Sequence, residues 1–181
     1  MTGDTELKRQ LVHRHIRPFP DFPKKGIMFR DICPILKEPA ALAAVIDLFE
    51  EHARKNYEKV ELIVGLDARG FLFGPLLAQR LGIGFVLIRK KGKLPGATVS
   101  VVYDLEYGTA EMEIQEDGVA PGQKVLLIDD LLATGGTLLA ACELMRKQQA
   151  EVLGCMVIIE LKELNGIEKL KPLSVYSLLE Y

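Results

Sequence analysis

The segment from Val125 to Thr137 constrains the fold of this chain more than any other part of it. It reads Val-Leu-Leu-Ile-Asp-Asp-Leu-Leu-Ala-Thr-Gly-Gly-Thr. The four apolar residues at its start predict a buried strand, and the apolar run over 138–147 predicts a helix after it. A strand, an acidic pair, a Gly/Thr loop and a helix, in that order, are typical of an anion site at the carboxyl edge of a parallel sheet.

The Gly/Thr loop has the chemistry of a phosphate site. Gly135 and Gly136 let the backbone approach a ligand closely and adopt a positive φ at little cost. The first N–H groups of the helix point outward without partners, and the helix dipole favours negative charge there. Because Thr134 and Thr137 add hydroxyl donors, we expect the loop 133–137 to bind a phosphate monoester.

Two carboxylates, Asp129 and Asp130, precede the loop. Carboxylates accept hydrogen bonds and bind hard cations, so the pair suits the hydroxyls of a sugar that carries the phosphate, or a Mg²⁺ ion near it. A strand end followed by a capped turn is the alternative for these residues taken alone. The chain contains no Gly-x-x-x-x-Gly-Lys-Ser/Thr motif, so the loop is not the P-loop of ATP-binding proteins.

Composition sets bounds on the class of protein. The chain has 181 residues and a net charge of −2, which fits one domain with a core and provides no global field for nucleic acid. Its 3 cysteines are scattered, so we expect no disulfide framework and a reducing compartment. The first ten residues contain no apolar signal core and no apolar run reaches membrane-spanning length, so we expect a cytoplasmic protein without membrane association.

The strand–loop–helix pattern recurs before the central segment. Apolar residues at 60–65 predict a strand, and a helix is expected over 71–81. Arg69 lies between them, where it is either a solvated loop residue or a clamp for a diphosphate. A third strand at 85–88 runs into a turn with four cations, which is either solvated or faces the same crevice; these are Arg89, Lys90, Lys91 and Lys93.

The remaining segments add a flap and an N-terminal extension. Residues 98–108 and 110–114 alternate apolar and polar side chains, which predicts a two-stranded antiparallel flap and a candidate lid. Three prolines within 17–23 predict that this segment is not regular structure. The apolar residues of 26–32 either cover the edge of a core or hold a flat base by stacking and edge hydrogen bonds.

These elements together predict an α/β fold in a single domain, 1–181. Its core is a mainly parallel sheet flanked by helices, with helices also expected over 5–16 and 39–55 and further strands over 152–161 and 174–179. The antiparallel flap covers about 96–116, and a small N-terminal hood covers about 1–35.

The segment 125–137 resembles the phosphoribosyl-diphosphate signature of the type I phosphoribosyltransferases. Five further segments, in the order of the family, are similar to its adenine-using members: 19–23, 29–32, 65–71, 88–96 and 105–108. The resemblance implies the fold of that family. It also implies a pentosyltransferase of purine salvage that transfers 5-phosphoribosyl from 5-phosphoribosyl-1-diphosphate to N9 of adenine, giving AMP and diphosphate.

The resemblance also implies roles for individual residues. The 5-phosphate would be held by Ala133, Thr134, Gly135, Gly136 and Thr137, and the ribose hydroxyls by Asp129 and Asp130, directly or through metal and water. The diphosphate would be held by Asp67, Ala68, Arg69, Arg89, Lys90 and Lys93. The Asp67–Ala68 peptide matches a position where such enzymes often have a cis bond.

Catalysis and base binding are assigned by the same resemblance. The catalytic residues would be Glu106, Arg69 and Asp130, with Glu106 assisting the loss of the adenine proton. Adenine would lie among Met28, Phe29, Arg30 and Leu161. Mg²⁺ would be bound through the substrate diphosphate and ribose hydroxyls without a direct protein ligand, and the protein would be a homodimer.

Two other functions remain open on the sequence. One is a phosphoribosyltransferase for a 6-oxopurine, whose hydrogen-bonding edge is the reverse of adenine's. The other is a non-catalytic regulator that binds phosphoribosyl diphosphate. Such regulators usually add a DNA-binding domain, for which this chain has no spare length and no basic helix.

Overall fold

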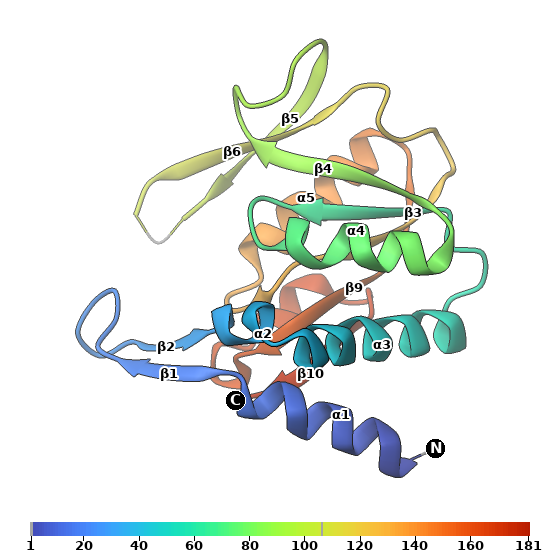
Figure 1. The fold of residues 1–181 in the computed structure, drawn as a ribbon. Coiled ribbons are helices and arrows are strands. Elements are labelled where there is room, and N and C mark those ends of the chain that lie inside the picture. Colours follow the sequence, from blue (N-terminus) through green and yellow to red (C-terminus); the bar gives the residue numbers. More distant parts are fainter. Residues whose placement is uncertain (1, 106) are drawn as a thin grey trace. The chain divides into compact units, whose positions relative to one another are not determined.

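The computed structural model describes residues 2–105 and 107–181, the side chain of Thr2 excepted (Figure 1). It divides into two compact units, Met1–His52 and Ala53–Tyr181. The single domain with a hood at about 1–35 therefore stays a prediction. In the part that the structure describes, no helix is long and apolar enough to cross a membrane.

The first unit consists of helices and one small sheet. Helix α1 (Thr2–Arg14) and helix α3 (Pro39–Asn56), which continues into the second unit, confirm the two helices predicted near these positions, and α2 (Cys33–Lys37) is a short addition. Pro39 begins α3, where its missing N–H would have had no partner. The Lys8 ammonium links the two long helices, at 3.5 Å from Asp47 and 2.7 Å from Glu51.

The prediction that 17–23 forms no regular structure is wrong for its first residues. Strand β1 (Arg17–Pro20) pairs antiparallel with β2 (Met28–Asp31) in a two-stranded sheet. Proline is tolerated in an edge strand because every second N–H points away from the neighbouring strand and has no ladder partner to lose. The two prolines of β1, Pro18 and Pro20, are two apart and so share one edge.

The second unit is built on one sheet, with the strand order β10-β9-β7-β3-β4-β6-β5 and β8 (Leu131–Leu132) paired to β9. Pairing is parallel from β10 to β4, and β6 and β5 are added antiparallel. This arrangement confirms the α/β class and the antiparallel flap (Figure 1). The other strands are β3 (Leu62–Leu66), β4 (Gly84–Lys90), β5 (Thr98–Asp104), β6 (Thr109–Gln115), β7 (Lys124–Ile128), β9 (Glu151–Glu160) and β10 (Val175–Glu180).

Two helices cover opposite faces of the central strands. Val64 and Leu127 lie in one buried cluster with Leu144 of α5 (Gly136–Lys147). Helix α4 (Gly70–Leu81) covers the opposite face. Phe85 of β4 points to that face and contacts α4. Two short 3₁₀ helices, η1 (Lys162–Leu164) and η2 (Gly166–Leu170), occupy the tail segment, where the sequence pattern is weak, and η2 contacts α5.

The ring of Phe85 fits between β3 and α4 because both elements place a glycine there. A Cβ on Gly65 would lie 2.5 Å from Phe85 Cζ, and a Cβ on Gly74 would collide with Phe85 Cε2. The ring of Phe71 lies edge-on to that of Phe85, with centroids 6.3 Å apart. These contacts set how closely α4 approaches β3, the strand that ends at Leu66.

We expect Gly74→Ala to destabilise the protein by about 1–3 kcal/mol, the usual cost of overpacking a core. Urea unfolding measures this loss. Adding Phe85→Leu should recover part of it, because the branched side chain leaves the space that the new methyl needs. Gly3→Ala is the matched control, since a Cβ on Gly3 meets nothing within 4 Å. Equal stabilities of Gly74→Ala and Gly3→Ala would contradict this account of the packing.

Candidate active site

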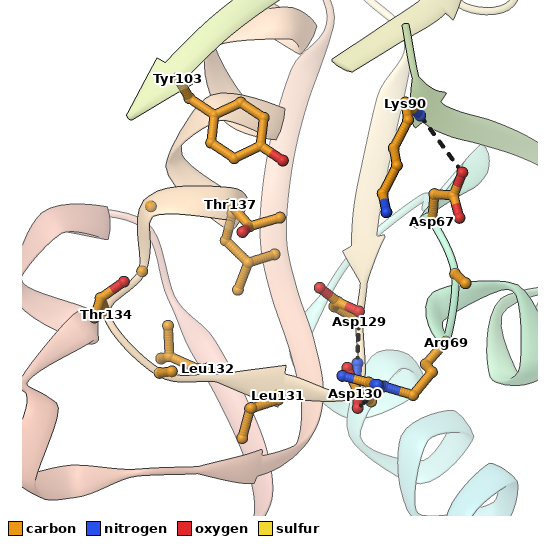
Figure 2. Close-up of a pocket in the computed structure, with 15 residues that line it drawn as sticks. Asp67, Arg69, Lys90, Tyr103, Asp129, Asp130, Leu131, Leu132, Thr134 and Thr137 are labelled. Atoms are coloured by element: carbon orange, nitrogen blue, oxygen red, sulfur yellow. Dashed lines mark hydrogen bonds and ion pairs between the residues drawn. The ribbon is translucent and has the colours of Figure 1, made fainter. Parts of the chain in front are cut away.

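A pocket of about 410 Å³ lies at the carboxyl ends of β3 and β7. These strands pair in parallel, with Gly65 opposite Ile128, so the loops that follow them meet at one edge of the sheet. Three groups of residues form its wall: Asp67–Arg69 after β3, Asp129–Leu138 after β7, and the side chains of Lys90 and Tyr103 (Figure 2).

The phosphate loop lies at the start of α5. Gly135 has a φ of 83° and caps the helix, so the left-handed conformation needs glycine there. A Cβ on Gly135 would collide with the carbonyl oxygen of Gly166, and a Cβ on Gly166 would collide with that of Ala133. All five residues of the loop 133–137 line the pocket, as their predicted role requires.

Asp130 joins the two loops. It is 7% exposed, and its carboxylate is hydrogen-bonded and ion-paired with the guanidinium of Arg69. A buried carboxylate needs such a partner, because an unpaired charge in the interior is strongly destabilising. The pairing therefore keeps the carboxyl group of Asp130 and the guanidinium of Arg69 together in the pocket wall (Figure 2).

Asp129 lies beside this pair, in surroundings that disfavour its ionised form. The backbone N–H of Asp130 donates to Asp129 Oδ1 at 2.9 Å. Burial, followed by the negative charge of Asp130, raises the pKa of Asp129 well above its usual range, and Arg69 only partly opposes this. A cation or a set of hydroxyl donors in the pocket would reverse the shift, so the site favours ligands that bring them.

Asp67 holds the start of the cationic turn. Its Oδ2 accepts a hydrogen bond from Arg89 Nε at 3.2 Å and from the backbone N–H of Lys90 at 3.4 Å. The peptide bond between Asp67 and Ala68 is cis, which confirms the prediction for this position. Lys90 extends its side chain toward the acid pair from the neighbouring strand (Figure 2).

Two of the predicted diphosphate ligands, Arg89 and Lys93, are not among the described residues that line this pocket. Arg89 is paired with Asp67, and its Nη1 lies 3.5 Å from the carbonyl oxygen of Lys93. Their contact with a diphosphate stays a prediction. Glu106 lies outside the described residues.

The predicted base-binding residues are described separately in the two units. Met28, Phe29 and Arg30 form most of β2, where the ring of Phe29 meets that of Phe22 edge-on, with centroids 5.0 Å apart. Leu161 follows β9, and its N–H donates to the carbonyl oxygen of Leu132 at 2.9 Å, next to the phosphate loop. Their common role in binding adenine stays a prediction.

Glu113 holds the cationic turn in place, and the sequence analysis did not predict this role. It is 2% exposed on β6, and its Oε1 accepts hydrogen bonds from the backbone N–H groups of three consecutive residues, Gly92, Lys93 and Leu94, at 2.9–3.1 Å. The bond from Leu94 does most to lower the pKa of Glu113, and bonds from the Thr98 hydroxyl and from Lys93 lower it further. Glu113 therefore fixes the turn that carries the cations. The sequence does contain an indication of this role. Glu111 and Glu113 are two acids at alternate positions of the flap, and their charge is opposite to that of the cationic turn.

Tyr103 was missed as well. It lines the pocket from β5, and burial raises the pKa of its phenol, with a further contribution from Asp129. Its hydroxyl therefore stays protonated at neutral pH and available as a donor. Nothing in the alternating pattern of the flap marks this tyrosine as a pocket residue.

We expect Asp129→Asn to stabilise the ligand-free protein at pH 7. The raised folded-state pKa means that Asp129 favours the fold when protonated, and that this contribution is lost as the pH rises through the folded-state value. Asparagine avoids that loss, so the gain should shrink as the pH falls toward the unfolded-state pKa of about 4, and it should vanish about one unit below that value, where the acid is protonated in both states. Urea unfolding between pH 4 and pH 8 measures it. Asp130→Asn should instead lose stability at pH 7, and a loss for both variants would contradict the assignment.

Comparison with known proteins identifies the family. The family model for the phosphoribosyl transferase domain matches residues 34–177. Adenine phosphoribosyltransferase of Rattus norvegicus is 57% identical over 178 residues, covering 98% of this chain and 99% of that protein. The human protein of the same name is 57% identical over 180 residues, covering 99% of both.

A solved structure gives the same result for the fold. Adenine phosphoribosyltransferase of Saccharomyces cerevisiae, complexed with D-2,5-dideoxy-2,5-imino-altritol 1,6-bisphosphate and adenine, superposes with a TM-score of 0.93 at 40% identity. The match covers 96% of this chain and 99% of that one. Similarity of this level over nearly the whole length shows that the chain belongs to the phosphoribosyltransferase family and, within it, to the adenine phosphoribosyltransferases.

Proposed function

We propose that this chain transfers the 5-phosphoribosyl group of 5-phosphoribosyl-1-diphosphate to N9 of adenine, giving AMP and diphosphate. One observation carries the proposal: a single pocket combines a phosphate loop at a helix start, an acid pair and the guanidinium of Arg69. The names of the rat and human relatives, and the adenine in the yeast complex, support adenine as the base.

The pocket offers a separate group of residues to each part of the sugar substrate. The outward N–H groups at the start of α5 and the hydroxyls of Thr134 and Thr137 suit the 5-phosphate. The carboxylates of Asp129 and Asp130 suit the ribose hydroxyls, which donate hydrogen bonds to them. Arg69 and Lys90 line the pocket as cations for the diphosphate.

The reaction is a displacement at the anomeric carbon of the ribose. The bond from this carbon to the diphosphate oxygen breaks, and its electron pair leaves with the diphosphate. N9 of adenine forms the new bond on the opposite face and loses its proton. Arg69 and Lys90 stabilise the charge that develops on the leaving group, while Asp129 and Asp130 stabilise the positive charge on the ribose.

Mg²⁺ fits this donor set. The carboxyl of Asp129 faces the pocket with a raised pKa, so a nearby cation would favour its ionised form. Asp129 and Asp130 would hold the ion through the ribose hydroxyls and water. The bound ion would neutralise charge on the diphosphate.

The flap of β5 and β6 has two roles in this proposal. It excludes water, which would otherwise hydrolyse the activated sugar, and Tyr103 already reaches the pocket from it. Glu106, between the two strands in the sequence, accepts the proton that adenine loses. A carboxylate is a suitable base for a proton whose acidity rises as the new bond forms.

Base selection is assigned to the backbone of β2. Pro18 lies opposite Arg30, and Pro20 lies opposite Met28, and neither proline can donate a hydrogen bond. We infer that the hydrogen-bonded pair is Phe19 with Phe29, so the N–H and C=O groups of Met28 and Arg30 point away from β1. A donor and an acceptor at this edge can match the amino group and N1 of adenine and mismatch a 6-oxopurine.

The proposal also places the protein in the cytoplasm as a homodimer, and the family resemblance supports both statements.

The test is diphosphate release from 5-phosphoribosyl-1-diphosphate with Mg²⁺, with adenine, hypoxanthine or guanine supplied separately. We expect release with adenine and a rate at least about 10⁴-fold lower with either 6-oxopurine, since the mismatched groups are left unpaired. Chelation of Mg²⁺ should abolish the reaction. Asp130→Asn should reduce kcat/KM by about 10²-fold or more, because it removes both a charge from the site and the partner of Arg69.

Other results would redirect the proposal. Release with a 6-oxopurine alone would retain the phosphate site and overturn the role of β2. Binding of 5-phosphoribosyl-1-diphosphate without release, with every base tested, would favour the non-catalytic regulator.

We expect Glu113→Gln to raise the KM for 5-phosphoribosyl-1-diphosphate roughly fivefold or more. The amide keeps an oxygen acceptor for the turn but loses the charge that strengthens its three backbone hydrogen bonds. The KM for adenine should stay within a factor of about two. Steady-state kinetics with each substrate varied in turn gives both values.

The control is Glu111→Gln, because Glu111 accepts a hydrogen bond from the Ser100 hydroxyl at 2.6 Å and none of the three backbone bonds of the turn. It should change neither KM. A fall in kcat with unchanged KM values in Glu113→Gln would mean a smaller active fraction and would contradict a positioning role.

A further inference from the structure

A second cavity, of about 570 Å³, lies in the same unit at the other end of α5. Apolar residues from α5, β9 and the segment 169–174 form most of its wall, and three cations line it: Arg146, Lys169 and Lys171. No acidic residue lines it among those that the structure describes. Lys171 is ion-paired with Glu168 at 2.8 Å, whereas Arg146 and Lys169 have no carboxylate within ion-pair distance in the described chain. The cavity therefore has a positive, half-apolar interior.

A thiol opens into this cavity. Cys142 is half-buried on α5, one helical turn before Arg146, and lines the cavity wall. Behind it, the thiol of the fully buried Cys155 of β9 interacts with its sulfur. Cys142 is thus a partly accessible sulfur with a thiol behind it and a guanidinium beside it.

The two thiols differ in acidity in a way that suits this geometry. The hydrogen bond with Cys155 and then the charge of Arg146 lower the pKa of Cys142, against opposing effects of burial and Glu143. The hydrogen bond with Cys142, followed by burial, raises the pKa of Cys155 well above its usual range. Cys155 therefore stays protonated, and Cys142 is the sulfur that becomes the thiolate.

We propose that Cys142 is a covalent exchange site for small anionic disulfides, with the cavity of Arg146, Lys169 and Lys171 as their binding pocket. The cations attract carboxylates on the disulfide, and the apolar wall accepts the rest of the molecule. Reactive cysteines are found in partly exposed, electropositive surroundings of this kind, whereas buried structural cysteines are inert. This site does not depend on the phosphoribosyl activity.

The exchange step is balanced without any other oxidant. Cys142 loses its proton to solvent, and its thiolate attacks one sulfur of the disulfide. A new sulfur–sulfur bond forms between Cys142 and that half of the reagent. The original sulfur–sulfur bond breaks, and its electron pair leaves on the other half as a thiolate. Cys155 keeps its proton and forms no bond with the reagent.

Cys33 provides an internal comparison. It is the exposed cysteine of the chain, at the start of α2. Its backbone N–H donates to Asp31, and Asp31 is ion-paired with Arg17 at 2.7 Å. Cys33 therefore has the carboxylate of Asp31 beside it, whereas no acidic residue lines the cavity of Cys142 among the described residues. Exposure alone would make Cys33 the faster thiol, whereas our proposal makes Cys142 faster for an anionic reagent.

The experiment uses the full chain and two chromogenic reagents of different charge. One is 5,5′-dithiobis(2-nitrobenzoate), which carries two carboxylates, and the other is neutral 2,2′-dithiodipyridine. Rates are measured for Cys33→Ser, which retains Cys142, and for Cys142→Ser, which retains Cys33. Each rate is divided by that of the same reagent with a small free thiol, and peptide mass spectrometry identifies the modified residue.

We expect the dianionic reagent to modify Cys142 first, with a ratio of anionic to neutral rate about tenfold higher at Cys142 than at Cys33. Arg146→Gln, in the Cys33→Ser background, should lower that ratio. Lys147→Gln is the matched control, because Lys147 lies outside the cavity and bonds the Ser100 carbonyl at 2.9 Å. The proposal is overturned if Cys33 reacts first with the dianionic reagent, or if the ratio at Cys142 is unchanged by Arg146→Gln.

Discussion

The ion pair between Arg69 and Asp130 is the interaction on which the rest of the site depends. Each residue follows a different strand, and the two strands are paired in parallel, so the ion pair forms only if the register of β3 against β7 is correct. Asp130 is nearly buried, and its charge would be costly without this partner. Once the pair is in place, Asp129 directly precedes it in the chain, and the phosphate loop and the start of α5 follow within a few residues.

The pocket brings opposite charges together without neutralising all of them. Asp130 is satisfied by Arg69, while the adjacent Asp129 is held in a state that resists ionisation. A substrate that carries phosphates, hydroxyls and a divalent cation relieves this imbalance, because it supplies the positive charge and the donors that the acid lacks. Part of the binding free energy of such a substrate therefore comes from groups that are poorly satisfied in the free protein.

The sequence pattern predicts the residues of the central segment, but it does not predict which residues contact one another across the sheet. The central strand, the acid pair and the glycine at the helix start are encoded within thirteen consecutive residues, and the structure has them where the pattern predicts. Glu113, Tyr103 and Gly166 acquire their roles from strand register and loop packing, which no local window contains. Strand β1 was not predicted for a related reason. Its prolines exclude a strand with two neighbours but are tolerated in a strand with one, and the sequence does not show how many neighbours a strand has.

The mutual contact of Gly135 and Gly166 limits how the phosphate loop can be transferred or can evolve. Each glycine leaves space for the backbone of the other loop, about thirty positions away in the printed sequence, so neither position can gain a side chain while its partner stays in place. A graft of the thirteen-residue segment into another α/β protein would carry the donors but not the second loop that shapes them. The thirteen-residue segment is therefore sufficient only together with the loop that contains Gly166, and a host protein would have to supply a loop of that shape.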